Sequence, residues 1–276
     1  MLLNNQFRCR YRHVYLNWRY CIGASVTLHQ NVFQQNDDHQ AVYLHLPNDP
    51  LIHITENTFV DLQGGALSLL LDRAVGPGLY SVIVSDNVFR SVGRQRLESA
   101  VSVSCWSGLL NISLTRNEFY SNVALATVLS NCAGLLVTEN TFVNPGASRD
   151  YEVRVQYGDG VTMFAHLNYW NATTFNEVAD RIYDYADNEN LAVVEASPWY
   201  LDSNRTQTAS GKHTLFKGPF EIGGEMETNI TLTSVEQPYR VTSQIIIPPG
   251  LSLVIEAGVT LVFSNAGITV KGQCYC

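Results

Sequence analysis

The chain has 276 residues, of which 46% are aliphatic, aromatic or cysteine and 15% are charged, and its formal net charge is −8. This apolar content excludes a disordered chain. The acidic balance and the lack of a basic run argue against nucleic acid as a partner, and no apolar run approaches the ~18–20 residues of a transmembrane helix.

The N-terminal segment lacks the apolar stretch of a signal peptide and already contains the first copy of a repeated motif. We therefore expect the chain to be a fragment, or a partial gene model, of a longer protein. Four arginines near the start are interpreted as the solvated face of a partial coil: Arg8, Arg10, Arg12 and Arg19.

The first 170 residues repeat one motif seven times: asparagine, any residue, then an aromatic residue. Successive asparagines are 23 to 30 residues apart, a period typical of solenoids, in which each unit buries its apolar face against its neighbours. The seven copies are Asn5 with Phe7, Asn31 with Phe33, Asn57 with Phe59, Asn87 with Phe89, Asn117 with Phe119, Asn140 with Phe142, and Asn168 with Trp170.

Strand patterns lie on both sides of each motif. Before the asparagine the residues are β-branched and aliphatic, as in 51–54 and 80–84, and about ten residues after the aromatic a segment alternates strictly, as in 41–46 and 100–104. Alternation sends every other side chain to one face, so each unit supplies two short strands with an inward apolar row. The sequence therefore predicts an all-β fold, a parallel β-helix (β-solenoid) of about seven coils over residues 1–170.

Other repeat folds do not fit. Leucine-rich repeats use ~20–29 residues with a leucine consensus, and propeller blades need ~40–50 residues with four strands. No amphipathic helical pattern separates the strands, which excludes the crossovers of a doubly wound α/β fold.

The asparagine–aromatic motif has a structural explanation. Asparagine tolerates the left-handed backbone of a corner, and stacked asparagines can hydrogen-bond from coil to coil. The aromatic residue would point inward and stack on its counterpart in the next coil. We therefore predict that these fourteen ladder residues are structural and do not bind a ligand.

Six cysteines and four glycosylation sequons favour a secreted protein or an ectodomain. Cys105 and Cys132 are about one coil apart, so they could bridge adjacent coils, and Cys9 with Cys21 is a second candidate pair. The sequon asparagines are Asn111, Asn171, Asn204 and Asn229.

The pattern changes after the array. Val178, Ile182 and Tyr185 have helical spacing, which predicts a short amphipathic helix over 177–187. We expect residues 171–201 to form a closing element that covers the last strand edges.

Residues 202–220 are polar and predict a linker. From residue 221 short strand patterns resume, punctuated by proline and glycine, so 221–276 is predicted to begin a second β-helix module that is truncated.

Several segments of the second half resemble one family. They are Asn-Tyr-Trp-Asn at 168–171, Asp-Arg-Ile-Tyr-Asp-Tyr at 180–185, Ser-Pro-Trp at 197–199, Ile-Pro-Pro-Gly-Leu-Ser-Leu-Val-Ile-Glu-Ala-Gly-Val-Thr-Leu-Val-Phe at 247–263 and Gly-Ile-Thr-Val-Lys-Gly at 267–272. The chain resembles the bark beetle (anakonda) family, most specifically over 168–272. That family comprises very large single-pass membrane proteins of invertebrate epithelia with right-handed β-helix modules and scavenger-receptor domains, which organise tricellular junctions and support septate junctions.

The resemblance implies that the coils are right-handed and that the parent protein is anchored in the plasma membrane outside this chain. It also implies that the partners are other junction proteins, or the same protein on a neighbouring cell. The expected function is a non-enzymatic extracellular scaffold for cell–cell adhesion, without a cofactor.

A carbohydrate-active β-helix, a polysaccharide lyase or hydrolase, is the first alternative. Its site would need carboxylates from neighbouring coils at the same phase, to hold Ca²⁺ or to share acid and base roles. The nearest candidates are Asp37, Asp38, Asp61 and Asp86, which lie at different phases relative to the asparagine. We therefore predict no catalytic site.

A glycan-binding module is the second alternative, and it would use outward aromatic residues. The candidates are Tyr43, Tyr120 and Tyr157, although tyrosines on strands mostly pack. The histidines, including His13, His45 and His53, show no metal-ligand spacing and are interpreted as surface or turn residues.

Overall fold

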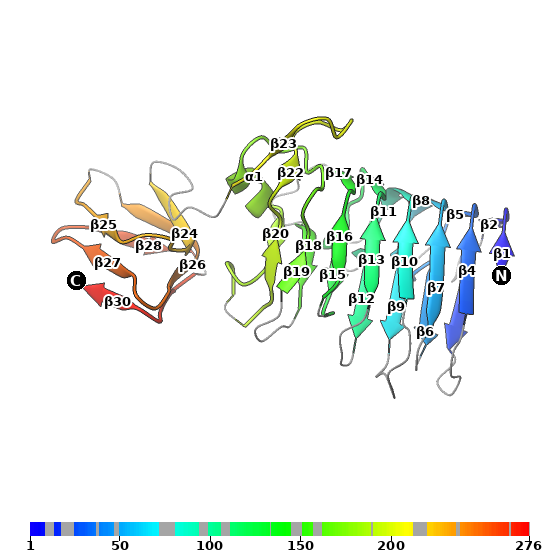
Figure 1. Cartoon of the computed structure of the whole chain (residues 1–276), viewed down its shortest axis with the longest axis horizontal. Helices are drawn as coiled ribbons and strands as arrows, with labels where there is room; N and C mark the ends of the chain where they lie inside the picture. The colour runs from blue at the N-terminus through cyan, green and yellow to red at the C-terminus, as the bar shows by residue number, and fades with distance from the viewer. Residues whose placement is uncertain are drawn as a thin grey trace.

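The computed structural model describes most of the chain and is nearly all β (Figure 1). The described residues are 1–8, 14–17, 25–36, 39–46, 50–71, 81–93, 99–105, 111–132, 134–144, 151–156, 162–188, 190–211, 220–235, 238–264 and 266–275. No described helix is long and apolar enough to cross a membrane.

The first six coils of the array each contribute one strand to each of three parallel sheets, A, B and C, and the last coils extend only sheets A and C. Sheet A consists of β1 (Leu2–Leu3), β4 (Ser25–His29), β7 (Leu51–Thr55), β10 (Ser81–Ser85), β13 (Ile112–Thr115), β16 (Leu136–Thr138), β19 (Thr162–Phe164) and β21 (Val193–Glu195). Sheet B consists of β2 (Gln6–Arg8), β5 (Val32–Gln34), β8 (Thr58–Leu62), β11 (Val88–Val92), β14 (Glu118–Tyr120) and β17 (Thr141–Val143). Sheet C consists of β3 (Val14–Asn17), β6 (Val42–Leu46), β9 (Leu67–Leu71), β12 (Ser99–Cys105), β15 (Ala126–Ser130), β18 (Tyr151–Val155) and β20 (Ile182–Tyr183).

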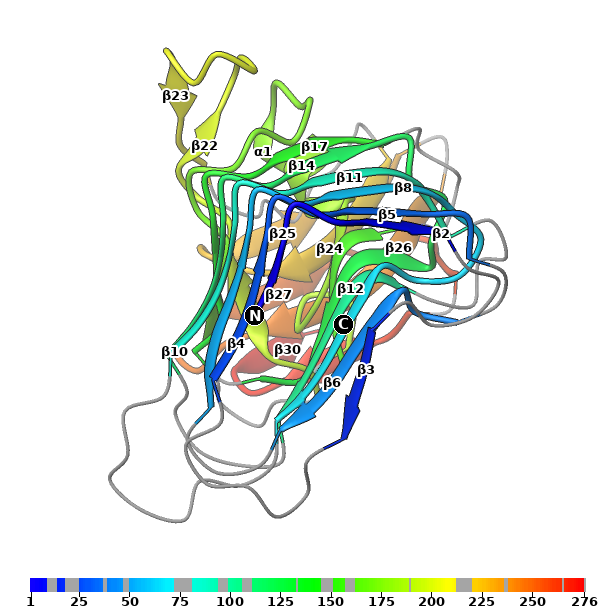
Figure 2. The same cartoon turned by 90° about the vertical axis from the view of Figure 1, so that its right-hand side faces the viewer.

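Figure 2 views the array from its N-terminal end. The chain runs up sheet A, across sheet B and down sheet C, and it turns clockwise as it recedes from the viewer, so the coil is right-handed. The predicted parallel β-helix is confirmed.

The number of strands in a coil was predicted incorrectly. Two strands were expected, but the residues after each asparagine form a third strand in sheet B, such as β5 and β14. These strands are as short as three residues and bury little beyond the ladder aromatic, Phe33 or Phe119. Such a strand is too short to show the alternation by which strands are recognised in a sequence.

The corner between sheets A and B also differs from expectation. The left-handed residue is the one before each ladder asparagine, not the asparagine itself. Because the preceding residue makes the turn, the asparagine side chain is free to point inward and reach the next coil. The left-handed residues of this corner are Asn4, Gln30, Glu56, Asp86, Arg116, Glu139 and Leu167, with φ between 53° and 59°.

Residues 171–183 complete the seventh coil, and residues 193–200 begin an eighth. Helix α1 (Phe175–Ala179) begins at a capping box, in which Thr174 accepts from the Glu177 backbone and Glu177 accepts from the Thr174 backbone. It ends well before residue 187, because Ile182 joins sheet C opposite Val153. Strand β21 then extends sheet A. The predicted helix over 177–187 was therefore correct only for 177–179 and wrong for the rest.

Strand β22 (Trp199–Tyr200) pairs antiparallel with β23 (Thr208–Ala209), which lies in the expected linker. Residues 221–275 then fold around a separate core of eight buried side chains. One parallel sheet contains β24 (Glu221–Glu225), β26 (Tyr239–Ile247), β28 (Leu261–Phe263) and β29 (Ile268–Val270), and another contains β25 (Ile230–Leu232), β27 (Ser252–Ile255) and β30 (Gln273–Tyr275).

Candidate functional surfaces

The asparagine ladder is saturated by hydrogen bonds within the array. The Oδ1 atom of Asn57 accepts from the backbone N (2.9 Å) and Nδ2 (3.0 Å) of Asn31, and its own Nδ2 donates to Leu28 O at 2.9 Å and to Asn87 Oδ1 at 3.0 Å. The same pattern repeats through Asn168. The predicted coil-to-coil bonding is confirmed, and it engages the amide atoms that a ligand would need.

The aromatic ladder forms one stack of nearly parallel rings. The ring centroids of Phe59 and Phe89 are 4.8 Å apart with an interplanar angle of 2°. Trp170 ends the stack, and its Nε1 has no hydrogen-bond partner among the described residues. The rings from the second coil onward are fully buried, so the predicted inward stacking is confirmed. In coil order the stacked residues are Phe7, Phe33, Phe59, Phe89, Phe119, Phe142 and Trp170.

A disulfide joins Cys105 and Cys132, whose Cα atoms are 5.1 Å apart. It links the coil of β12 to the coil of β15, as the spacing predicted. The second candidate pair, Cys9 and Cys21, lies outside the described residues.

All four sequon asparagines are exposed, in contrast to the ladder asparagines from Asn31 onward, which are buried. Asn171 has a left-handed backbone, with φ of 53°, and accepts from the Tyr169 hydroxyl at 2.9 Å. Asn229 accepts from the Ser252 backbone at 2.9 Å. Each asparagine is therefore accessible to a modifying enzyme.

A row of charged side chains along the edge between sheets A and B was missed. Glu56, Asp86, Arg116 and Glu139 each precede a ladder asparagine, so they share one phase. The expectation that no acids share a phase was wrong, because it compared Asp86 only with Asp61 and with 37–38. We call these four residues the charged edge.

The central ion pair of the charged edge is bidentate. Arg116 Nε lies 2.7 Å from Asp86 Oδ1 and its Nη2 lies 2.8 Å from Oδ2, while Nη1 is 3.8 Å from Glu139. The hydrogen bonds from Arg116 hold the pKa of the Asp86 carboxyl below its usual value. Asp86 is therefore suited to stay ionised and is poorly suited to act as a general acid.

The remaining candidates are scattered. Asp61 is exposed at the corner between sheets B and C, with φ of 52°. Tyr43 stacks on Tyr15 with centroids 5.2 Å apart, and Arg90 lies 5.9 Å from the Tyr120 ring centroid. Four candidates lie outside the described residues: Asp37, Asp38, Tyr157 and His13.

His53 is exposed, as expected, but His45 is buried, so its interpretation as a surface or turn residue was wrong. It lies in β6, where the strand alternation did not reveal the burial. Among the described residues no cluster of three or more His, Cys, Asp or Glu side chains could hold a metal ion.

A buried carboxylate at the C-terminal end of the array was also missed. Glu152 is 4% exposed, and it accepts from Thr127 Oγ1 at 2.7 Å, from Asn144 Nδ2 at 2.6 Å and from Arg181 Nη1 at 3.2 Å. Burial raises its pKa. Because the partners come from three coils, the network ties the end of the array together.

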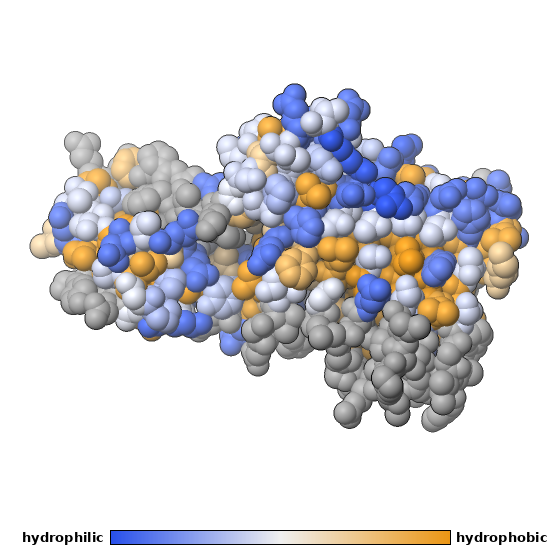
Figure 3. Space-filling view, viewed as in Figure 1, coloured by the Kyte–Doolittle hydropathy of each residue, from blue (hydrophilic) through white to orange (hydrophobic). Residues whose placement is uncertain are grey.

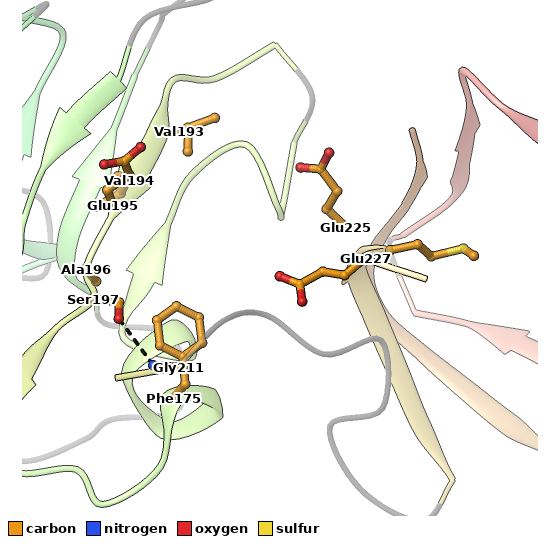
Figure 4. A pocket seen from close by; sticks show the side chains of 10 residues that line it. Phe175, Val193, Val194, Glu195, Ala196, Ser197, Gly211, Glu225 and Glu227 are labelled. Atoms are coloured by element: carbon orange, nitrogen blue, oxygen red, sulfur yellow. Dashed lines mark hydrogen bonds between the residues drawn. The ribbon is translucent and has the colours of Figure 1, made fainter. Parts of the chain in front are cut away.

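An open cleft of about 510 Å³ lies between the last coil and the second module (Figure 4). Glu225 and Glu227 extend from the second module, while Glu195 and Phe175 line the side of the array. On another side of the junction, Lys271 Nζ donates to the Tyr185 hydroxyl at 2.7 Å. The cleft gathers three carboxylates, but no described residue that lines it is basic.

The outward face of sheet A has few charged residue types over seven of its eight strands, where its outward side chains are apolar or hydroxyl residues and two histidines, His29 and His53. At the outward positions of the described strands β1 to β19 there is no Asp, Glu, Lys or Arg; the first charge is Glu195 in the last strand. Leu51 is 42% exposed, Phe164 40% and Val193 39%. This face is turned toward the viewer in Figure 3, where apolar residues gather across its middle.

Comparison of the chain with family models, with curated proteins and with solved structures finds no significant match to any of them.

Proposed function

We propose that the chain is a non-enzymatic β-helix scaffold in the extracellular part of a large junction protein, where it supports tricellular and septate junction organisation and adhesion. The observation that carries the scaffold role is the asparagine ladder. Its polar atoms are engaged by neighbouring coils, from Asn31 to Asn168, so the length of the array is devoted to rigidity.

The extracellular part of the proposal is supported by two further observations. The Cys105–Cys132 disulfide suits an oxidising compartment, and the four sequon asparagines are all exposed. The junctional part is supported by the resemblance of 168–272 to the bark beetle (anakonda) family.

The test of the junctional role is the location of the parent protein. The full-length parent, tagged at its own locus, is expected at the vertices where three epithelial cells meet. A uniform distribution along cell borders, or an intracellular one, would refute the junctional role.

The extracellular role is tested separately on the chain fused to a secretion signal. Enzymatic deglycosylation is expected to lower the mass of the secreted chain, and single Asn→Gln variants at Asn111, Asn171, Asn204 and Asn229 assign the sites. A secreted chain without any glycan and with six free thiols would refute it.

One observation favours a second candidate, a carbohydrate-active β-helix. Three carboxylates, Glu56, Asp86 and Glu139, share a phase on the charged edge, which is the arrangement such a site requires. The purified chain is incubated with acidic polysaccharides with and without Ca²⁺, beside an Asp86→Asn variant. If the wild type cleaves a polysaccharide and the variant does not, the chain is an enzyme, and the non-enzymatic scaffold role is refuted.

A further inference from the structure

We infer that the outward face of sheet A binds a second copy of this chain, face to face about a two-fold axis. The inference deepens the proposed function, on which it rests only for its biological setting, because it names the partner and the surface.

The argument begins with charge. Two copies that each carry a net charge of −8 repel one another wherever acidic side chains meet. The charged edge has Glu56, Asp86 and Glu139 at its surface, and the cleft beside the second module has three more carboxylates. Sheet A avoids this repulsion, because its outward positions from β1 to β19 carry no carboxylate.

Composition supports the same face. The central outward row runs through Thr27, His53, Ile83, Ser113, Leu136 and Phe164, which are in register on six successive strands, and its last four strands carry three apolar residues and one serine. Hydroxyl residues, such as Ser81, lie between the apolar ones on this face. Depletion of charge around a centre of apolar side chains distinguishes the core of a protein interface from the rest of a surface.

The size of the face suits a modest dimer. The eight strands have two to five residues each. At about 4.8 Å between strands and about 3.3 Å per residue, they cover roughly 500 Å² on each copy, or about 1,000 Å² in total. This area is at the lower limit of specific interfaces, so we expect a dissociation constant on the order of 10 μM rather than a permanent dimer.

The two-fold symmetry makes the pairing specific. A two-fold interface uses the same patch on both copies, and residues near the axis meet their own counterparts. Ser113 lies in β13, near the middle of sheet A, and its side chain is outward and half-buried. We therefore place the axis close to Ser113.

A glycan would interfere with this pairing at one position. Asn111 directly precedes β13, at the margin of the same face, and is exposed. A glycan attached there would stand between the two copies. The inference therefore predicts that chains glycosylated at Asn111 are monomeric and that an Asn111→Gln chain pairs.

The experiment is sedimentation of the secreted Asn111→Gln chain from about 1 μM to about 1 mM, a range that brackets the expected constant. Dimer is expected to accumulate as concentration rises. Ile83→Asp and Ser113→Asp, each added to this chain, are expected to weaken pairing at least tenfold, because each puts two like charges into the interface. Val88→Asp is the matched control, since Val88 belongs to the same coil as Ile83 and is also half-buried and outward, but on sheet B.

A charge-swap experiment distinguishes loss of pairing from misfolding of the variants. Ser113→Asp and Ser113→Lys chains are each expected to be monomeric alone and to associate when mixed. A monomeric Asn111→Gln chain over the whole range, or equal dissociation constants for the Ile83→Asp and Val88→Asp variants, would overturn the inference. These results are obtained on the isolated chain, so they are distinguishable from a failure of the proposed junctional location, which is observed in an epithelium.

Discussion

The array and the second module satisfy their buried polar groups in different ways. In the array, each interior ladder asparagine hydrogen-bonds to the asparagines of the coils on either side. The side chain of Asn87, for example, takes part in five hydrogen bonds. The described part of the second module has no such ladder and turns its corner at Gly223 and Gly224, where the register of β24 against β26 shifts. Ser243 Oγ, buried at that corner, has no hydrogen-bond partner among the described residues.

This difference shows how a periodic sequence satisfies the hydrogen bonds of its buried polar groups. A polar side chain repeated at one phase always finds an identical partner about 4.8 Å away, so a buried amide costs little. Where the repeat is lost, the chain turns with glycine instead. Buried polar atoms without a partner among the described residues lie off the asparagine ladder in both regions: Asn17 Oδ1, Asn36 Oδ1 and Trp170 Nε1 in the array, and Ser243 Oγ in the second module. The following predictions test this contrast, from the largest expected effect to the smallest.

The largest effect is expected for Asn87→Ala. The substitution leaves the backbone N of Asn57 and the carbonyl of Ile54 without the amide partner they have in the array. Each buried group without a hydrogen bond costs ~1–3 kcal/mol, so we expect the free energy of unfolding to fall by about 4 kcal/mol. All four tryptophans precede residue 200 in the chain, and none lies in 221–276, so urea unfolding followed by tryptophan fluorescence measures the stability of the array.

The control is Asn5→Ala, because Asn5 is exposed at the first rung. It is expected to cost less than about 1 kcal/mol. An equal loss of unfolding free energy in the two variants would contradict the difference between a buried interior asparagine and the exposed asparagine at the end of the ladder.

In the second module the matching test is Gly223→Ala. A Cβ atom there would lie 2.8 Å from Ser243 O, and the φ of Gly223 is +155°. We expect a loss of about 2–3 kcal/mol, in the range of overpacking and backbone strain. Hydrogen exchange of the β24 and β26 amides measures it without interference from the array.

Gly250→Ala is its control. Gly250 also has a positive φ, +85°, but nothing lies within 4 Å of its Cβ position. We expect only the strain of the backbone, about 1 kcal/mol. A larger loss at Gly250 than at Gly223 would contradict the close approach to Ser243.

The next prediction concerns Glu152, a buried carboxylate that does not belong to a ladder of equivalent residues in neighbouring coils. Burial raises the pKa of Glu152 in the folded chain, so folding disfavours its ionised form. The resulting destabilisation is absent below the unfolded pKa and develops as pH rises through the unfolded pKa toward the raised folded one. The free energy of unfolding of the wild type, relative to Glu152→Gln, should therefore fall as pH rises through that window; a rise instead would show that Arg181 outweighs burial.

The smallest effect on the free energy of unfolding is expected on the charged edge, where the ion pair between neighbouring coils is exposed to solvent. Side chains of Arg116 and Asp86 are 48% and 39% exposed, so screening limits the pair to less than about 1 kcal/mol. The lowered pKa of Asp86 gives a contribution present above the unfolded pKa and lost as pH falls through the folded one. A double-mutant cycle of Arg116→Ala and Asp86→Asn at low and high salt checks it; a coupling that does not change with salt would contradict the exposed geometry.

Much of the array was predictable because its information is local and repeated. The asparagine at a fixed phase indicated the length of a coil, the aromatic two residues later indicated the core, and the spacing of Cys105 and Cys132 indicated a bridge between neighbours. Phe59 and Phe89, for example, are 30 residues apart in the chain and lie directly opposite one another in sheet B. Each of these patterns depends on contacts between equivalent positions, which the repeat itself reveals.

The misses arose where one coil departs from the others or where a segment is short. Three-residue strands such as β5 carry too little alternation to be recognised. Ile182 fits a helix equally well by its spacing from Val178, and only its pairing with β18 decided for a strand. Glu152 is surrounded by partners from three coils, which no single segment could indicate.

By itself, the sequence determined the repeat, the parallel β-helix and the structural role of the asparagine and aromatic ladders, because identical residues at one phase can only meet one another in a stack. The tertiary structure decided which outward rows lie side by side. It placed Glu56, Asp86 and Glu139 on one edge and left the face of sheet A without a carboxylate from β1 to β19. The reason is that a surface is formed from residues that are about one coil apart in the chain, and their alignment depends on where each corner turns.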